Sequence, residues 1–358
     1  MTQEELLMLR CIELAGNGLG HVAPNPLVGS VVEFNGEIVG EGFHQVYGGP
    51  HAEVHAIRDA LHHLSDEQLR SATLYVNLEP CAHHGKTPPC ADLIVKHKFK
   101  RAVIGCQDTF SEVQGKGIVR LQEAGIVVRV GCLENECREL NKQFFTFHEK
   151  KRPYVILKWA QTTSGFIAPP IKNRNPYWIS SLLAKQRSHQ WRSEEHAILI
   201  GANTLLHDNP KLNTRLWKGE APIPIYIDRD LSVPTDKSLF GIHKKIYCVV
   251  DHKHAPSNLK RKNIHYLPID FNKELSKQIA LTLFEQKISS VIVEGGTKTL
   301  ALFLGAGLWD EIRLFETKGN INEGIKAPSF NAILDSEEYL GNTLLKVYKK
   351  NHLKDAII

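Results

Sequence analysis

The residues that most constrain this chain are His51, Glu53, Cys81 and Cys90, which form a His-x-Glu motif followed by two Pro-Cys pairs. One imidazole and two thiolates make a three-ligand zinc site and leave the fourth tetrahedral position for water. Zinc lowers the pKa of such a water to about 7, so hydroxide is available at neutral pH. We therefore predict a catalytic zinc ion bound by His51, Cys81 and Cys90.

Glu53 lies two residues after His51, close enough to share the zinc site without being a ligand. A carboxylate there can take a proton from the attacking water and pass it to a leaving amine, so we predict Glu53 as the catalytic residue. Zinc deaminases combine H-x-E with a later P-C-x-x-C, whereas eight residues separate the two cysteines here. The alternatives are that these residues belong to an ordinary core, or that they form a structural zinc site closed by a fourth protein ligand, for which His83 and His84 are candidates.

Three longer segments contain these motifs, namely 24–29, 51–56 and 79–90. They resemble the bifunctional deaminase–reductase family of riboflavin biosynthesis, in which the wide spacing between the two cysteines is usual. The resemblance implies a cytidine-deaminase-like N-terminal domain. It also implies that Asn25 lines the pyrimidine pocket and that Glu53 shuttles protons.

The composition favours an ordinary globular protein of two domains, because the chain has 358 residues with 42% hydrophobic and 23% charged residues. No run of about eighteen apolar residues occurs, so we expect no membrane span. The first residues are acidic and lack the basic and apolar regions of a signal peptide. Seven cysteines do not suggest a disulfide framework in a chain of this size, so we predict a reducing cytoplasm.

The net charge of +5 is mild, and the lysines and arginines are scattered along the chain. Short basic runs at 150–152 and 260–262 are typical of solvated surface, so we predict no nucleic-acid binding. A mild positive excess suits a phosphorylated small-molecule substrate.

Helices and strands are expected to alternate through the N-terminal part. Thr2 and Glu5 fit a capping box at the start of a first helix, and Asn35-Gly36 predicts a β-hairpin. We expect the apolar face of the first helix to consist of Leu6, Leu9, Ile12 and Leu14. Helices are predicted at 2–16, 51–64, 91–98, 118–124 and 133–150. Strands are predicted at 27–34, 37–43, 72–78, 101–106 and 126–130. This alternation predicts an α/β fold.

The basic stretch 150–152, followed by Pro153, is the expected domain boundary, which gives domains at 1–150 and 151–358. The C-terminal part is predicted to form a second α/β domain. Its strands are expected at 154–160, 197–200, 223–227, 246–250, 290–293, 311–315 and 343–348. Its helices are expected at 182–192, 274–286 and 298–304.

Strand 291–293 runs into Glu294-Gly295-Gly296 and then into a helix. Glycines let backbone N–H groups approach a phosphate, and a helix N-terminus favours its charge. The alternative is a tight strand-to-helix turn without a ligand.

Five segments of this half resemble the reductase half of the same family, namely 158–168, 178–180, 201–204, 208–215 and 294–296. The resemblance implies a dihydrofolate-reductase-like fold that uses NADPH. The cofactor contacts it implies are Ala160, Trp178, Thr204, Asp208, Gly296, Thr297, Lys298, Thr299, Leu300, Ala301 and Leu302. The substrate contacts it implies are Lys158, Arg192, Leu212, Arg215 and Glu294. Without the resemblance, Arg192 would be interpreted as a surface cation and Trp178 as a core aromatic residue.

Two positions depart from the family pattern. Ser164 stands where family members commonly carry Asp, and Pro176 stands where a hydroxyl residue would contact the substrate. We expect Ser164 to replace the acid structurally by capping the turn at Gly165 through local backbone hydrogen bonds.

The zinc motifs together with the family resemblance imply a zinc-dependent deaminase joined to an NADPH-dependent reductase. The first domain would deaminate a diaminopyrimidinone ribosyl phosphate, and the second would reduce its ribosylamino side chain to ribitylamino. Two alternatives remain at this point: a nucleic-acid base deaminase whose C-terminal half binds RNA, and a deaminase with a regulatory C-terminal half. A homo-oligomer is compatible with the sequence, which leaves the oligomeric state open.

Overall fold

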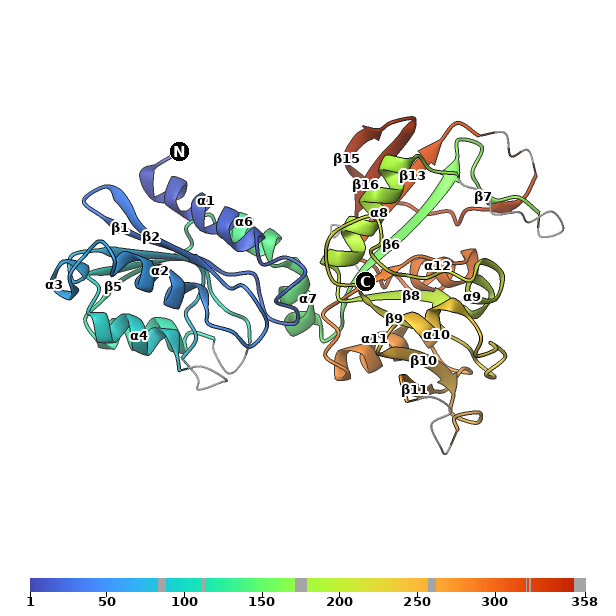
Figure 1. Cartoon of the computed structure of the whole chain (residues 1–358), viewed down its shortest axis with the longest axis horizontal. Helices are drawn as coiled ribbons and strands as arrows, with labels where there is room; N and C mark the ends of the chain where they lie inside the picture. The colour runs from blue at the N-terminus through green and yellow to red at the C-terminus, as the bar shows by residue number, and fades with distance from the viewer. Residues whose placement is uncertain are drawn as a thin grey trace. The chain divides into compact units, whose positions relative to one another are not determined.

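Two separate sheets organise the chain. A computed structural model describes residues 1–82, 88–110, 114–170, 179–256, 262–319, 321 and 323–350. The chain divides into two compact units, Met1–Lys150 and Lys151–Ile358, and each unit is built around its own sheet (Figure 1). His83, His84, Trp178 and Pro176, which the sequence singled out, lie outside the described residues.

The first unit has a five-stranded sheet in the order β2-β1-β3-β4-β5. Its strands are β1 (Gly29–Phe34), β2 (Glu37–Phe43), β3 (Thr73–Leu78), β4 (Arg101–Cys106) and β5 (Val127–Val130). The strand β1 pairs antiparallel with β2 and β3, whereas β3, β4 and β5 run parallel. Its helices are α1 (Gln3–Gly16), α2 (Ala52–Ala60), α3 (Asp66–Leu69), α4 (Cys90–His97), α5 (Lys116–Glu123), α6 (Glu134–Leu140) and α7 (Lys142–Lys150).

Helices cover both faces of this sheet, because successive side chains of each strand point to opposite faces. Leu74 and Val76 of β3 pack with α2, α4 and α5 on one face. Tyr75, between them, packs with α1, α6 and α7 on the other. Two buried faces explain why β3 and β4 are almost continuously apolar.

Most predicted elements of the first unit are confirmed. Thr2 and Glu5 form the capping box of α1, and Asn35 and Gly36 adopt positive φ at the tip of the β1–β2 hairpin. The predicted apolar face of α1 was wrong in part, because Leu6 is exposed. The buried face consists of Leu7, Met8, Cys11, Leu14 and Ala15.

Two predicted helices differ from the structure, one in where it ends and one in its continuity. The helix expected at 51–64 ends at Ala60, and the one expected at 133–150 is divided into α6 and α7 at Asn141. The Asn141 side chain accepts a hydrogen bond from the Leu27 N–H at 2.8 Å and donates to the Leu27 carbonyl at 2.9 Å. This long-range contact explains the break, since an Asn side chain competes with helical backbone bonding.

The second unit has a nine-stranded sheet in the order β11-β10-β9-β8-β12-β6-β13-β16-β15. All neighbours from β11 to β13 are parallel, and β16 and β15 extend the sheet antiparallel. The strands of this sheet are β6 (Tyr154–Thr162), β8 (Ala197–Gly201), β9 (Ile223–Ile227), β10 (Ile246–Asp251), β11 (Ile264–Ile269), β12 (Ser290–Val293), β13 (Glu311–Thr317), β15 (Ile333–Leu340) and β16 (Thr343–Lys349). A separate two-stranded sheet pairs β7 (Phe166–Ala168) with β14 (Ile325–Lys326).

The helices of this unit are α8 (Leu182–Glu194), α9 (Ala202–Asp208), α10 (Ser238–Ile242), α11 (Leu275–Glu285) and α12 (Thr297–Gly305). The helices α11 and α12 pack on one face of the large sheet, and α8, α9 and α10 pack on the other. The carboxyl ends of β8 and β12 therefore meet the starts of α9 and α12 at one edge.

The strand β15 was not predicted, nor were α9, α10, β7, β11 and β14. The strand β15 has apolar residues only near its two ends, and seven of its eight residues are exposed, so it carries no apolar alternation. The predicted α/β class is confirmed for both units. Across the described part of the chain, no helix is long and apolar enough to cross a membrane.

Candidate active sites

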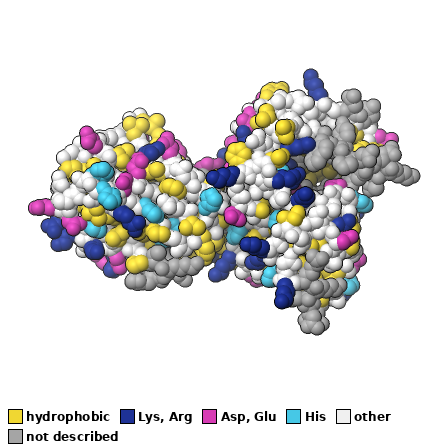
Figure 2. All heavy atoms as spheres, viewed as in Figure 1, with side chains coloured by type: hydrophobic (Ala, Val, Ile, Leu, Met, Phe, Trp, Pro, Cys, Tyr) yellow, Lys and Arg dark blue, Asp and Glu magenta, His cyan; other side chains and the backbone are white. Residues whose placement is uncertain are grey.

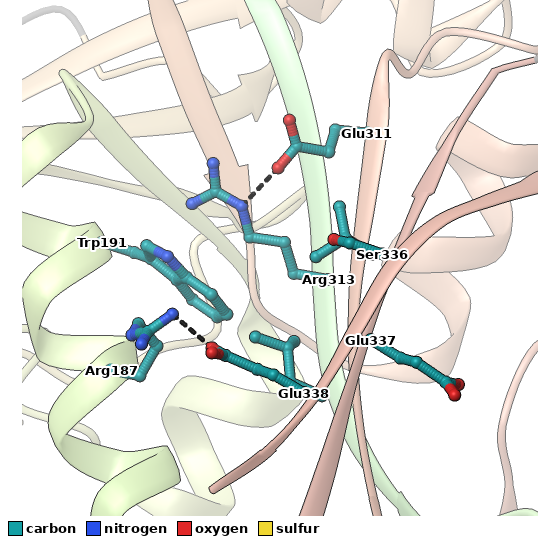
Figure 3. A pocket seen from close by; sticks show the side chains of 9 residues that line it. Arg187, Trp191, Glu311, Arg313, Ser336, Glu337 and Glu338 are labelled. Carbon is teal, nitrogen blue, oxygen red and sulfur yellow. Dashed lines mark hydrogen bonds and ion pairs between the residues drawn. The ribbon is translucent and has the colours of Figure 1, made fainter.

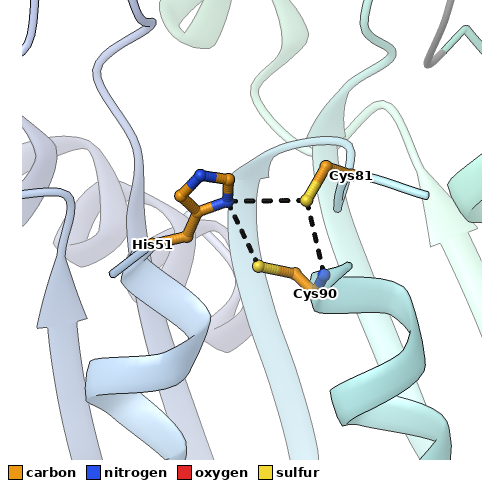
Figure 4. A group of neighbouring side chains, drawn as sticks. All are labelled: His51, Cys81 and Cys90. Carbon is orange, nitrogen blue, oxygen red and sulfur yellow. Dashed lines mark hydrogen bonds between the residues drawn. The ribbon is translucent and has the colours of Figure 1, made fainter. Parts of the chain in front are cut away.

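The three predicted zinc ligands meet at one point of the first unit. His51 is the N-cap of α2, Cys81 follows β3 by three residues, and Cys90 opens α4. The His51 Nδ1 atom lies 3.5 Å from the Cys81 Sγ and 3.3 Å from the Cys90 Sγ. All three donor atoms lie within 4.8 Å of one another (Figure 4).

The charge state of the two thiols suits a metal. The Cys90 thiol and then His51 lower the pKa of the Cys81 thiol to about 4 by hydrogen bonding, while the same contact with Cys81 raises the pKa of Cys90. The Cys90 backbone N–H also donates to the Cys81 sulfur at 3.3 Å. The lowered pKa favours the thiolate form of Cys81, and an S₂N donor set fits zinc. The fourth-ligand alternative concerns His83 and His84, outside the described residues.

Glu53 lies beside the ligands in the first turn of α2. Its carboxylate is buried, and its Oε2 atom has no hydrogen-bond partner among the described residues. Burial raises the pKa of Glu53, which the His51 imidazole partly opposes. An unsatisfied buried carboxyl oxygen is costly, and it marks the position where a water or substrate group would bind.

His44 was not identified from the sequence, yet it orients the predicted pyrimidine contact Asn25. Its Nδ1 atom lies 3.0 Å from the Pro50 carbonyl, and its Nε2 atom lies 3.1 Å from the Asn25 Nδ2. A carbonyl can only accept, so Nδ1 carries the proton and Nε2 accepts from the Asn25 amide. Burial lowers the pKa of His44 and keeps it neutral in this role. A lone histidine after a strand offered no sequence signal.

Glu79 holds the loop after β4 against the zinc ligands. Its carboxylate accepts hydrogen bonds from the backbone N–H groups of four residues, Asp108, Gly115, Gly117 and Ile118. A Cβ at Gly117 would lie 2.0 Å from the Pro80 carbonyl oxygen, so only glycine fits there. The Glu79-Pro80-Cys81 motif thus has a supporting residue as well as a ligand.

The second site is an ion cluster where β6, β12 and α8 meet. Arg192 of α8 donates to both oxygens of Glu294 at 3.0 and 2.7 Å, and the Lys158 Nζ lies 3.8 Å from Glu294 Oε2. Burial alone would raise the pKa of Glu294, but Arg192 and Lys158 lower it to about 2. Burial lowers the pKa of Lys158. The structure thus brings together three residues that were predicted to contact the substrate, Lys158, Arg192 and Glu294.

Arg215 and Leu212 lie on the loop beside this cluster. The Arg192 Nη1 atom donates to the Asn213 carbonyl at 3.3 Å, and the Arg215 Nη1 donates to the Asn213 Oδ1 at 3.1 Å. Leu212 is buried with φ of 50°, which turns the loop back toward α8. The guanidinium group of Arg192 is therefore already occupied, whereas Arg215 is exposed.

His189, one helical turn before Arg192, was also missed. It is buried, and its Nδ1 atom has no hydrogen-bond partner in the described structure. Burial, together with the charges of Arg192 and Arg215, lowers the pKa of His189 to about 4, while a hydrogen bond to the Asn213 backbone opposes the shift. A neutral His189 thus ties α8 to the Asn213 loop.

The predicted phosphate-binding turn lies at the edge where β8 and β12 end. Gly296 is the N-cap of α12 with φ of 65°, and a Cβ at Gly295 or Gly296 would lie 3.2 Å from the Thr204 side chain. A Cβ at Gly201 would lie 2.7 Å from the Thr299 hydroxyl. Close backbone approach at this edge fits a pyrophosphate-bearing cofactor such as NADPH.

The other predicted cofactor contacts among the described residues lie on three elements. Ala160 is on β6, Thr204 and Asp208 are on α9, and Thr297 to Leu302 form the first two turns of α12. The structure brings the turn at Gly296 next to Thr204 but shows no contact that would assign Ala160 or Asp208 to a cofactor.

Ser164 does not cap the Gly165 turn as predicted. Its hydroxyl lies 2.8 Å from the Thr162 Oγ1 and donates to the Ile321 carbonyl at 3.1 Å. The Thr162 hydroxyl instead accepts the local backbone N–H, from Phe166 at 3.2 Å. Ser164 therefore bonds to a residue far away in the sequence, and the residues next to Ser164 could not predict that contact.

Comparison with known proteins covers both units. Residues 1–106 match the cytidine and deoxycytidylate deaminase zinc-binding region, and residues 153–316 match the RibD C-terminal domain. The riboflavin biosynthesis protein RibD of Aquifex aeolicus is 39% identical over 322 residues, covering 89% of this chain and 88% of that protein. Its counterpart in Escherichia coli is 35% identical over 327 residues, with 87% of each chain covered.

The fold also matches a solved structure over nearly its whole length. The diaminohydroxyphosphoribosylaminopyrimidine deaminase/5-amino-6-(5-phosphoribosylamino)uracil reductase of Thermotoga maritima is 35% identical with a TM-score of 0.87, and the match covers 98% of this chain and 99% of that one. The predicted deaminase-like and reductase-like domains are thereby confirmed.

Proposed function

Since the chain belongs to the RibD family of bifunctional deaminase–reductases of riboflavin biosynthesis, we propose which of its residues carry each reaction. The deaminase is zinc-dependent, and the reductase uses NADPH. The observation that carries the assignment is the His51, Cys81 and Cys90 cluster with an unpartnered Glu53 oxygen beside it. The deaminase activity belongs to residues 1–150 and the reductase activity to residues 151–358.

In the deaminase, His51, Cys81 and Cys90 would hold the zinc ion, which supplies a water with a pKa near 7. Glu53 takes a proton from the attacking water and delivers it to the departing 2-amino group. A C–O bond forms, the C–N bond breaks, and ammonia leaves. Asn25, held by His44, positions the pyrimidine ring through its free amide oxygen. Burial raises the pKa of Glu53, which helps it to hold the proton between these two transfers.

In the reductase, NADPH, once bound, would supply hydride to C1′ of the ribosylamino group. The C1′–O4′ bond breaks, and the ring oxygen takes a proton to become a hydroxyl. Glu294, kept ionised by Arg192 and Lys158, is suited to accept hydrogen bonds from ribose hydroxyls. The exposed Arg215 on the Asn213 loop is suited to bind the phosphate group, since its planar donor fork matches phosphate oxygens. The cofactor would bind along Gly296 to Leu302 and Thr204, and the family resemblance adds Ala160, Trp178 and Asp208 as further contacts.

The two reactions can be separated in one preparation of the full chain. We expect one zinc ion per chain by metal analysis and ammonia release from 2,5-diamino-6-ribosylamino-4(3H)-pyrimidinone 5′-phosphate in the absence of NADPH. We expect NADPH oxidation once the deaminated product is supplied. Ammonia release that persists after the zinc has been removed would refute the metal assignment. NADPH oxidation in the absence of the deaminated product would refute the order of the two reactions, deamination before reduction.

We also place the enzyme in the cytoplasm as a homo-oligomer. All seven cysteines are free thiols, which supports a reducing compartment. The exposed edge strand β15 supports association between copies. Its substrate is a phosphorylated ribosylaminopyrimidine, and we propose neither nucleic acid nor membrane as a partner.

A further inference from the structure

One edge of the nine-stranded sheet collects the loops that follow four neighbouring parallel strands. The carboxyl ends of β12, β8, β9 and β10 lie side by side in this order. Gly201, the last residue of β8, is paired with Ile227, the last residue of β9. Neighbouring strands lie about 4.8 Å apart, so the loop after β9 begins one strand from the Gly201 turn and two strands from the Gly296 turn. This loop therefore lies beside the edge that fits the cofactor pyrophosphate.

Hydrogen bonds and a left-handed residue fix the shape of this loop, which spans residues 228–233. The buried Asp228 carboxylate accepts from the Ser232 N–H and the Ser232 hydroxyl, each at 3.0 Å, and from the Val233 N–H at 2.9 Å. Leu231 has a φ of 59°. Residues other than glycine rarely adopt this conformation, and those that do are concentrated at ligand-binding and catalytic sites. The loop thus presents Arg229 in one fixed backbone arrangement.

Arg229 is held at this edge by a buried acid that has a free oxygen. The Arg229 side chain is 58% exposed, and its Nε lies 3.5 Å from the Oδ2 of Asp251, the last residue of β10. Asp251 is buried, its N–H donates to the Arg229 carbonyl at 3.0 Å, and its Oδ2 has no hydrogen-bond partner among the described residues. The described residues supply no hydrogen-bond acceptor to the Arg229 guanidinium, which stays available to a ligand.

Other cations of the second unit differ from Arg229 in their partners and their place. Figure 2 shows Lys and Arg side chains at many points of this surface, so exposure alone does not identify a phosphate ligand. A cavity of about 390 Å³ is lined by Arg187 and Arg313 (Figure 3), but each of them donates to a carboxylate at 2.6 Å. This cavity lies beside the start of β13, at the opposite edge of the sheet from the carboxyl ends of the strands. Arg229 combines exposure, an unused guanidinium and a place at the cofactor edge.

The part of the cofactor that reaches this loop follows from the order of the strands. In doubly wound nucleotide-binding sheets, the pyrophosphate lies on a glycine-containing turn, and a residue further along the chain contacts the adenosine ribose. An acid there binds the 2′-hydroxyl of NAD, whereas an arginine accommodates the 2′-phosphate of NADP. Arg229 follows the strand next to β8, so it lies at the corresponding place for a pyrophosphate bound at the Gly201 and Gly296 turns. Its planar donor fork matches two phosphate oxygens.

We propose that Arg229 binds the 2′-phosphate of NADPH and makes the reductase selective for NADPH over NADH, and that Asp251 positions its guanidinium. This inference rests on the cofactor site proposed above and adds the residue that recognises the phosphate. Without Arg229, the Asp251 carboxylate would face the 2′-phosphate with no cation between them, and two like charges repel each other. The loss should therefore affect NADPH and spare NADH, whose ribose has an uncharged hydroxyl at that position.

Calorimetric titration of the full chain with 2′,5′-ADP and with 5′-AMP tests the contact without turnover. We expect Arg229→Ala to weaken 2′,5′-ADP at least about tenfold and 5′-AMP less than about twofold, because only the first ligand carries the 2′-phosphate. Lys277→Ala is the matched control, since Lys277 is a cation of α11 with a similar exposure of 59%. The proposal would be overturned by equal affinity of wild type and Arg229→Ala for 2′,5′-ADP, or by a wild type that binds 2′,5′-ADP no more tightly than 5′-AMP.

Steady-state reduction of the deaminated product measures the selectivity itself. Arg229→Ala should raise KM for NADPH at least about tenfold, with kcat and the KM for NADH each within about twofold of wild type. Asp251→Asn should raise only the KM for NADPH, by about threefold, since the guanidinium loses an ion pair. An equal rise for both cofactors would show that Asp251 merely stabilises the fold, and an unchanged preference for NADPH in Arg229→Ala would refute the selectivity. A wild type that oxidises no NADPH would instead refute the proposed reductase reaction, so the two failures are distinguishable.

Discussion

The zinc site and the ion cluster of the reductase are both buried and polar, but they differ in how far their groups are satisfied. Glu53 has one oxygen without a hydrogen-bond partner among the described residues, and the Cys81 and Cys90 sulfurs lie beside the His51 imidazole. In the reductase, Glu294 has two cationic partners, and Arg192 is bound on three nitrogens. The first site presents three metal-ligating atoms and a carboxyl oxygen to what it binds. The second site is preorganised by its own ion pairs.

The largest expected effect tests the unsatisfied site. Glu53→Gln removes the proton carrier and keeps the three zinc ligands, so we expect deamination to fall by about 10²- to 10⁴-fold. Metal analysis should still find one zinc per chain, and reduction of added deaminated product should be unchanged. The matched control is Glu123→Gln, an exposed acid of the same unit. Deaminase turnover within about threefold of wild type would contradict the role of Glu53.

The preorganised site should respond through stability as well as activity. Glu294→Gln leaves the buried Arg192 and Lys158 without their counter-charge, which typically costs about 3–5 kcal/mol. We expect a matching loss in the free energy of unfolding of the second unit by urea titration, together with loss of reduction. Deamination should persist. Glu274→Gln, on an exposed Glu at the start of α11, is the control. Unchanged stability would mean that the cluster is not a structural unit.

A pH titration sharpens the same contrast. The pKa of His189 is about 4 in the folded chain and about 6.5 when unfolded. Between these values the unfolded chain binds the extra proton, so stability is complete above pH 6.5 and is lost as the pH falls toward 4. From pH 7.5 to pH 5 we expect His189 to account for about 2 kcal/mol of that loss.

Urea unfolding of wild type and His189→Gln at the two pH values measures this contribution. Gln cannot titrate but can still donate to the Asn213 backbone. The variant should therefore lose about 2 kcal/mol less on acidification, within the second unit only. Equal pH slopes in the two proteins would show that His189 does not titrate as inferred.

His44 offers a smaller test on the deaminase side. His44→Phe keeps the buried ring but removes the acceptor that orients Asn25, a hydrogen bond worth about 1 kcal/mol. We expect KM for the pyrimidine substrate to rise about fivefold with little change in kcat and no loss of zinc. A fall in kcat with KM unchanged would place His44 in the chemical step instead.

The smallest effect is expected at Ser164. Asp at this position cannot donate to the Ile321 carbonyl, so Ser164→Asp should lose about 1 kcal/mol of stability and gain no reductase turnover. Ser164→Ala should show the same loss without the added charge. A gain of about tenfold in turnover for Ser164→Asp would show that the acid common in the family orients a catalytic group that this chain lacks.

The sequence alone predicted the His51, Cys81 and Cys90 cluster that the structure brings together, Glu53 beside it, the α/β class and most elements with apolar periodicity. The ligands stand in short motifs at helix starts and a strand end, where local backbone places them. Asn25, Lys158, Arg192 and Glu294 required a family resemblance, because no local pattern connects them.

Only the tertiary structure decided which distant groups meet. His44, His189 and Asn213 act through partners on other elements, and a single polar side chain carries no signal of such a partner. Likewise, β15 is a strand because β16 pairs with it, since its own sequence does not alternate between apolar and polar residues. Hydrogen bonds and ion pairs between distant segments form only when the packed core brings those segments together, so their residues cannot be recognised one at a time.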